Sequence, residues 1–172
     1  MYGLFPNPKE LKKKLETMKI TLDRYYGDGV VTKSFVTITM DGAGAPVLKC
    51  EAREPKFCDY TEAFAGCSSY CLACGQYDCK VVSTDLSPMT LTVVKSPGHR
   101  CCRFHYDESR QVRANTVLLG AGDGNEDLKW RRIIGCKTTY MEFEKLVYEC
   151  FVRGEKITLF INSASIPDGN SQ

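Results

Sequence analysis

Half of the cysteines in this chain fall in one short stretch, and that stretch constrains the fold more than any other feature. Five of the ten cysteines lie within residues 58–80. At its centre Cys71-Leu-Ala-Cys74 precedes Gly75, and a CxxC pair followed by glycine can fold as a tight knuckle that directs two thiolates at one tetrahedral ion. Few aliphatic residues accompany these cysteines, so the stretch needs cross-links to hold one conformation. The sequence therefore predicts an irregular, cysteine-rich excursion over residues 58–80 that is stabilised by zinc.

The predicted structural zinc ion takes its four ligands from the cluster itself. Four cysteines stand at knuckle-like spacing, namely Cys67, Cys71, Cys74 and Cys79. The alternate ligands are one more cysteine of the cluster and four residues of a His/Cys segment, namely Cys58, His99, Cys101, Cys102 and His105. A split site that joins Cys71 and Cys74 to Cys102 and His105 needs a turn between the last two, and neither glycine nor proline stands there. The local four-cysteine site is therefore preferred over the split site, and two zinc ions that use both regions are a third possibility.

Length and charge set the broad class of protein. A chain of 172 residues is long enough for one domain with its own core, and a formal net charge of +2 gives no global reason to expect nucleic-acid or membrane binding. The first residues lack the apolar stretch of a signal peptide, and charges interrupt every later apolar run. These features predict an intracellular protein, cytoplasmic or nuclear, in which thiols favour metal over disulfides. A secreted protein that has lost its signal is the alternative.

Hydrophobic periodicity predicts two helices around a mostly antiparallel sheet. Asn7 and Pro8 suit the start of an N-terminal helix, whose apolar stripe has helical spacing and comprises Leu11, Leu15, Met18 and Leu22. A capping box at Thr139–Glu142 begins a second helix over about 140–153. Strands are predicted over 30–40, 47–52, 79–83, 89–95, 100–106, 112–119, 131–138 and 157–161. The expected fold is a single α+β domain over residues 1–172.

A closed zinc site and the lack of a clear acid/base pair favour a non-enzymatic binding or regulatory module that acts through protein–protein contacts. The sequence does not identify the protein partner. Nucleic-acid binding is a weaker variant, because the lysine face of the first helix would have to join the arginines between residues 100 and 113. Two alternatives use the same cysteines: a secreted, disulfide-stapled binding protein, and a cysteine hydrolase with Cys67 as nucleophile and His99 or His105 as base.

Overall fold

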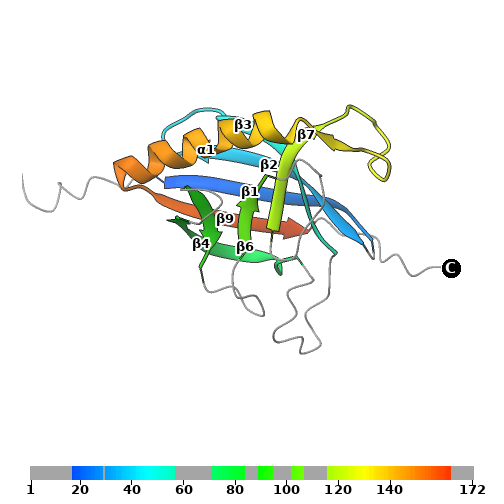
Figure 1. The fold of residues 1–172 in the computed structure, drawn as a ribbon, viewed down its shortest axis with the longest axis horizontal. Helices are drawn as coiled ribbons and strands as arrows, with labels where there is room; N and C mark the ends of the chain where they lie inside the picture. Colours follow the sequence, from blue (N-terminus) through cyan, green and yellow to red (C-terminus); the bar gives the residue numbers. More distant parts are fainter. Residues whose placement is uncertain are drawn as a thin grey trace, which may run out of the picture.

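The computed structural model describes residues 17–28, 30–56, 71–83, 89–94, 102–106 and 116–163. These ranges contain nine strands and one helix (Figure 1). In chain order the elements are β1 (Thr17–Gly27), β2 (Val31–Met40), β3 (Leu48–Pro55), β4 (Gly75–Val82), β5 (Thr90–Val93), β6 (Cys102–His105), β7 (Thr116–Gly122), β8 (Ile133–Ile134), α1 (Cys136–Arg153) and β9 (Lys156–Ser163). No helix in the described ranges is long and apolar enough to cross a membrane.

Eight of the strands form a closed barrel. They pair in the order β3-β2-β1-β9-β4-β5-β6-β7, and β3 also pairs with β7 to complete the ring. In the closing pair Ala52 faces Leu119 in antiparallel register. The pairs β1–β9 and β6–β7 are parallel, and the other pairings are antiparallel. Closure removes the exposed sheet edges that would otherwise template aggregation.

Strand alternation builds the core of the barrel. In β1 every second side chain points inward, and Met18, Ile20, Leu22 and Arg24 are all fully buried. The inward side chains of the other barrel strands join them in one continuous hydrophobic cluster. The helix α1 lies across the barrel (Figure 1), and its inner face belongs to the same cluster through Phe143 and its neighbours. The domain therefore has one main core that the barrel and the helix share.

The predicted N-terminal helix is wrong where the structure describes it, because Thr17–Gly27 form strand β1. Met18 and Leu22 are four residues apart, a spacing that fits both a helix and a strand of period two. Ile20 decides between them, since it lies midway and is also buried. The other residues of the predicted stripe and cap, Asn7, Pro8, Leu11 and Leu15, lie outside the described residues.

The predicted α+β class is also wrong, since the described chain is mostly β-strand and forms a closed barrel with one helix. The helix expected over 140–153 is present and begins earlier, at Cys136. The strand expected over 131–138 is reduced to Ile133–Ile134. Gly135 follows it with a φ of 60°, in the left-handed region that favours glycine, and the chain turns there into α1.

Candidate functional site

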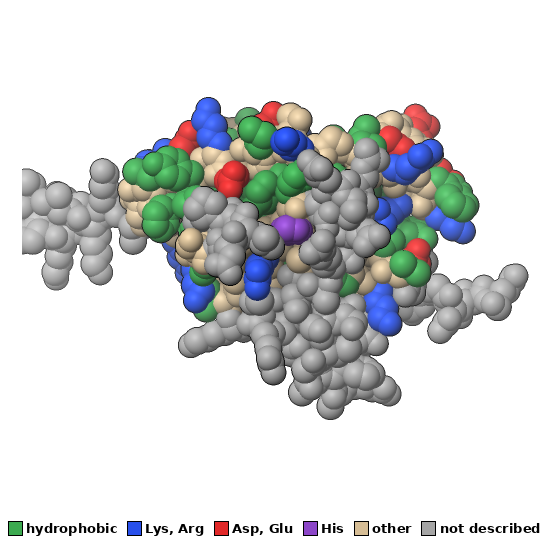
Figure 2. Space-filling model, viewed as in Figure 1, with side chains coloured by type: hydrophobic (Ala, Val, Ile, Leu, Met, Phe, Trp, Pro, Cys, Tyr) green, Lys and Arg blue, Asp and Glu red, His purple; other side chains and the backbone are tan. Residues whose placement is uncertain are grey.

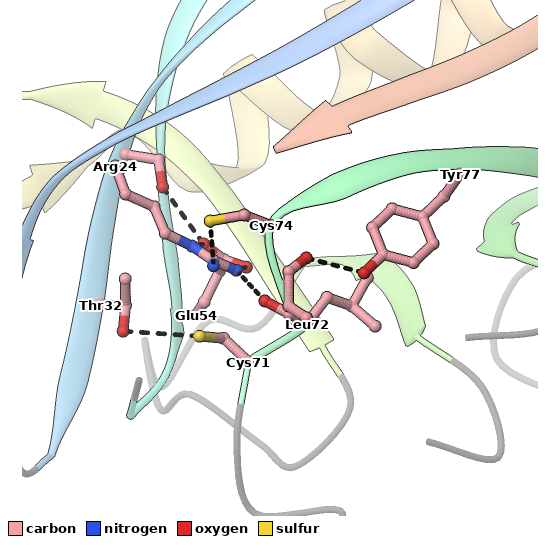
Figure 3. Close-up of polar contacts among 9 residues, drawn as sticks. Arg24, Thr32, Glu54, Cys71, Leu72, Cys74 and Tyr77 are labelled. Atoms are coloured by element: carbon pink, nitrogen blue, oxygen red, sulfur yellow. Dashed lines mark hydrogen bonds and ion pairs between the residues drawn. The ribbon is translucent and has the colours of Figure 1, made fainter. Parts of the chain in front are cut away.

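A buried ion pair lies inside the barrel, where β1, β2 and β3 face the Cys71–Cys74 segment (Figure 3). Arg24 and Glu54 have side-chain exposures of 0% and 1%. The Arg24 Nε donates to Glu54 Oε2 at 3.0 Å and its Nη2 donates to Oε1 at 2.8 Å, while Ser34 Oγ adds a third donor to Oε2 at 3.2 Å. Burial would lower the pKa of Arg24, but the charge and hydrogen bonds of Glu54 raise it above its ordinary value. The contact between the guanidinium and the carboxyl group is therefore bidentate.

The same guanidinium holds the CxxC segment against the barrel. The Arg24 Nη2 donates to the backbone oxygen of Leu72 at 2.6 Å, and Nη1 lies 3.8 Å from the Cys74 Sγ. From the other side Tyr77, in β4, donates its hydroxyl to the backbone oxygen of Ala73 at 2.7 Å. Leu72 itself is buried in the core. A salt bridge inside the barrel thus anchors this segment (Figure 3).

The cysteines of the motif have separate surroundings. Cys71 is buried, and its Sγ lies 3.8 Å from the Thr32 Oγ1. Burial, and next the charge of Glu54, raise the pKa of the Cys71 thiol to about 12. Cys74 is exposed, and Cys79 is half-buried in β4, where burial raises the pKa of its thiol to about 12. The seven cysteines in the described ranges form no disulfide with one another.

The zinc-finger interpretation is wrong for the described part of the chain. No group of three or more His, Cys, Asp or Glu side chains there is arranged to hold a metal ion. The thiols of Cys71 and Cys74 contact Thr32 and Arg24, and the excursion predicted as irregular over 58–80 includes the regular strand β4. Among the predicted ligands, Cys67 of the local four-cysteine site and the alternates Cys58, His99 and Cys101 lie outside the described residues.

The alternate ligands Cys102 and His105 lie on the extended strand β6. Cys102 is buried in the core, while His105 is half-buried three residues later. In an extended strand, residues three apart point to opposite faces, so these two side chains do not converge on one ion. The hydrolase alternative needs Cys67, which the structure does not describe, so it stays a prediction.

A second polar cluster fastens the segment after β7 to the outside of the barrel. Glu51, in β3, accepts hydrogen bonds from the Tyr25 hydroxyl at 2.8 Å and from the Arg131 Nε at 2.7 Å. Burial, and next the hydrogen bond to Glu51, raise the pKa of Tyr25 above its ordinary value. Lys33 donates to the backbone oxygens of Lys129 and Arg131, each at 2.8 Å. These contacts are made within the protein and position the chain that leads into α1.

Among the described elements, α1 exposes the most large apolar side chains. Four of its large apolar side chains are 53–64% exposed, namely Met141, Tyr148, Phe151 and Val152. Figure 2 shows hydrophobic side chains over the C-terminal end of α1, at the left of the view. The inner face buries Phe143, Val147 and Cys150. A helix that buries one apolar face and still exposes four large apolar side chains has apolar surface beyond what its own core needs.

The sequence predicts neither the exposed apolar side chains of α1 nor the buried ion pair of Arg24 and Glu54. The apolar periodicity of the second helix places Phe151 on the buried face, whereas that side chain is 55% exposed. For Arg24 the available signal is its place in the alternation of Ile20 and Leu22, which puts a cation on the inward face of a strand. That signal is only visible once residues 17–27 are recognised as a strand.

Comparisons of the chain with known protein families, with curated proteins and with solved structures found no match. The fold and the surfaces described above are therefore the basis for inferring function.

Proposed function

We propose that this protein is a non-enzymatic interaction module, a β-barrel that binds a second copy of itself through the outer face of α1. The observation that carries the proposal is the row of exposed apolar side chains on a helix whose other face is already buried. The ionisable groups inside the barrel support a binding role, because Arg24 and Glu54 neutralise each other and fasten the CxxC segment. We therefore assign this ion pair a structural role, which is to hold the CxxC segment against the barrel.

The row of side chains is complementary to itself when two helices run antiparallel. The helix spans 18 residues, and its midpoint lies between Glu144 and Lys145. A twofold axis at that point places Glu144 of one copy beside Lys145 of the other, twice. One turn away on either side, Met141 of one copy meets Tyr148 of the other, and a thioether packs well against an aromatic ring. Opposite charges thus occupy the centre, and apolar contacts flank them.

The ends of the row complete the match. The same twofold axis sets Val152 against the aliphatic stem of Lys137, an exposed residue on the first turn of α1. A contact made by one helix of about 27 Å is smaller than a standard interface of about 800 Å² per partner. We therefore expect a weak dimer with a dissociation constant in the micromolar range, suited to control by protein concentration.

Sedimentation velocity of wild type and of Val152→Lys tests this surface. The wild type should shift from the 19.3 kDa monomer toward twice that mass over a range of about 5–500 µM. In Val152→Lys the new ammonium faces Lys137 of the other copy, so association should weaken at least about tenfold. A lysine in the last turn does not oppose the helix dipole, so the monomer should remain folded.

The matched control is Val30→Lys, which makes the same change at a side chain that is 79% exposed in the turn before β2. Association of this variant should equal that of the wild type. A wild-type protein that stays monomeric over the whole range would overturn the proposal. So would equal effects of the two substitutions, because association would then not depend on α1.

A further inference from the structure

Three sulfur atoms from three different elements meet beneath the C-terminal end of α1. The Cys150 Sγ lies 3.5 Å from the Met18 Sδ and 3.9 Å from the Met40 Sδ. Met18 and Met40 are direct partners in the register of β1 and β2, so their side chains stand side by side on one face of the sheet. Cys150 and Met18 are fully buried, while Met40 is only partly buried and gives the cluster an accessible side.

These distances suit three sulfur ligands around one ion. An ion about 2.3 Å from each of three sulfurs in a trigonal plane holds the sulfurs about 4 Å apart. Thiolate and thioether ligands select soft ions such as copper(I), whereas thioethers are poor ligands for harder divalent ions. The charge balance also favours a monovalent ion. The nearby Glu155 carboxylate is already paired with Arg153, so a monovalent cation and one thiolate are together neutral, whereas a divalent ion would leave a net charge at the buried site.

We propose that Cys150, Met18 and Met40 form a binding site for a soft monovalent cation, copper(I) in the reduced cell. On binding, the Cys150 S–H bond breaks, its proton passes to water, and the sulfur lone pair forms the bond to the metal. Each thioether donates one lone pair, and the oxidation state of the ion does not change. The site is distinct from the cysteine-rich stretch, and it lies on the inner face of α1, opposite the proposed dimer surface.

The protonation state of Cys150 sets the conditions for binding. Burial, and next a hydrogen bond with the Glu155 carboxylate, raise the pKa of this thiol to about 12. Without metal the thiol is therefore protonated near neutral pH. A metal that binds the sulfur has to displace this proton, as happens whenever a thiol becomes a metal ligand.

Silver(I), which has no accessible redox change in water, is the probe for the test. Protein labelled with ¹³C at the methionine methyl groups carries five methionines, and Ag⁺ is added to ten equivalents, one for each cysteine. The methyl resonances of Met18 and Met40 should both shift during the titration. Met141 lies on the outer face of α1, away from this cluster, and its resonance should stay in place whether or not a second copy covers that face.

Two variants keep the test decisive. Met40→Leu conserves volume, so the fold should persist while the affinity measured at the Met18 methyl falls at least about tenfold. Cys150→Ala should abolish the shifts of both methionines. The proposal is overturned if neither resonance moves by ten equivalents, if Met141 moves together with them, or if the shifts persist in Cys150→Ala. A pattern that repeats with copper(I) under anaerobic conditions would support the site as a copper site, and its failure there would overturn that assignment.

Discussion

Replacing Arg24 by methionine is expected to lower the free energy of unfolding by about 3–5 kcal/mol, the cost of leaving one member of a buried ion pair without its partner. In that variant the Glu54 carboxylate stays in the barrel at 1% exposure, and Ser34 is the side-chain donor left to it among the described residues. The backbone oxygen of Leu72 also loses its donor, so the CxxC segment loosens. Urea denaturation followed by circular dichroism measures the loss.

The double variant Arg24→Met with Glu54→Leu separates the cost of a stranded charge from the value of the pair. Buried ion pairs can often be replaced by apolar side chains of similar volume with little loss of stability. We therefore expect the double variant to recover most of the loss and to keep a wild-type spectrum. A loss of less than about 1 kcal/mol in the free energy of unfolding of Arg24→Met would contradict the burial of the Glu54 carboxylate.

The second large effect is expected at Phe143, which fastens α1 to the barrel. Its ring is 1% exposed and stacks on Phe104 with centroids 5.0 Å apart. Phe143→Ala removes that contact and leaves a cavity in the shared core, so the free energy of unfolding should fall by about 3–5 kcal/mol. Thermal and urea melts at concentrations well below the dissociation constant of the proposed dimer give the value without a contribution from association.

Phe151→Ala is the matched control, because it makes the same substitution at an exposed position two turns further along the same helix. That ring is 55% exposed, so its loss should change stability by no more than about 0.5 kcal/mol. Equal losses at the two positions would contradict the orientation of α1. The comparison also shows whether the outer face serves the fold of the monomer or is available for a partner.

The sequence predicts elements well where one period dominates. Strict alternation is sufficient to locate β2 and β9, and the apolar periodicity around Phe143 and Val147 is sufficient to locate α1. The prediction from sequence is wrong at β1, because the spacing of Met18 and Leu22 fits both the helical period and the strand period. Closure of the barrel is not predictable in this way, since it depends on pairing between β3 and β7, which lie more than sixty residues apart in the chain.

The cysteine motif shows a different limit. Spacing alone makes Cys71 and Cys74 good zinc ligands, yet their neighbours are set by strands that are distant in the sequence. Thr32 is 39 residues from Cys71, and Arg24 is 50 residues from Cys74. A motif gives the capacity of a thiol to bind metal, whereas the residues that pack against it decide whether that capacity is used.

The contact most specific to the proposed dimer joins Met141 of one copy to Tyr148 of the other. Mixing protein that carries ¹³C-labelled methionine methyl groups with unlabelled protein, above the dissociation constant, allows a filtered nuclear Overhauser experiment to detect contacts between copies alone. We expect a cross-peak from the Met141 methyl to the Tyr148 ring protons, and its loss in Val152→Lys. A sample that sediments as a dimer without this cross-peak would contradict antiparallel pairing through α1.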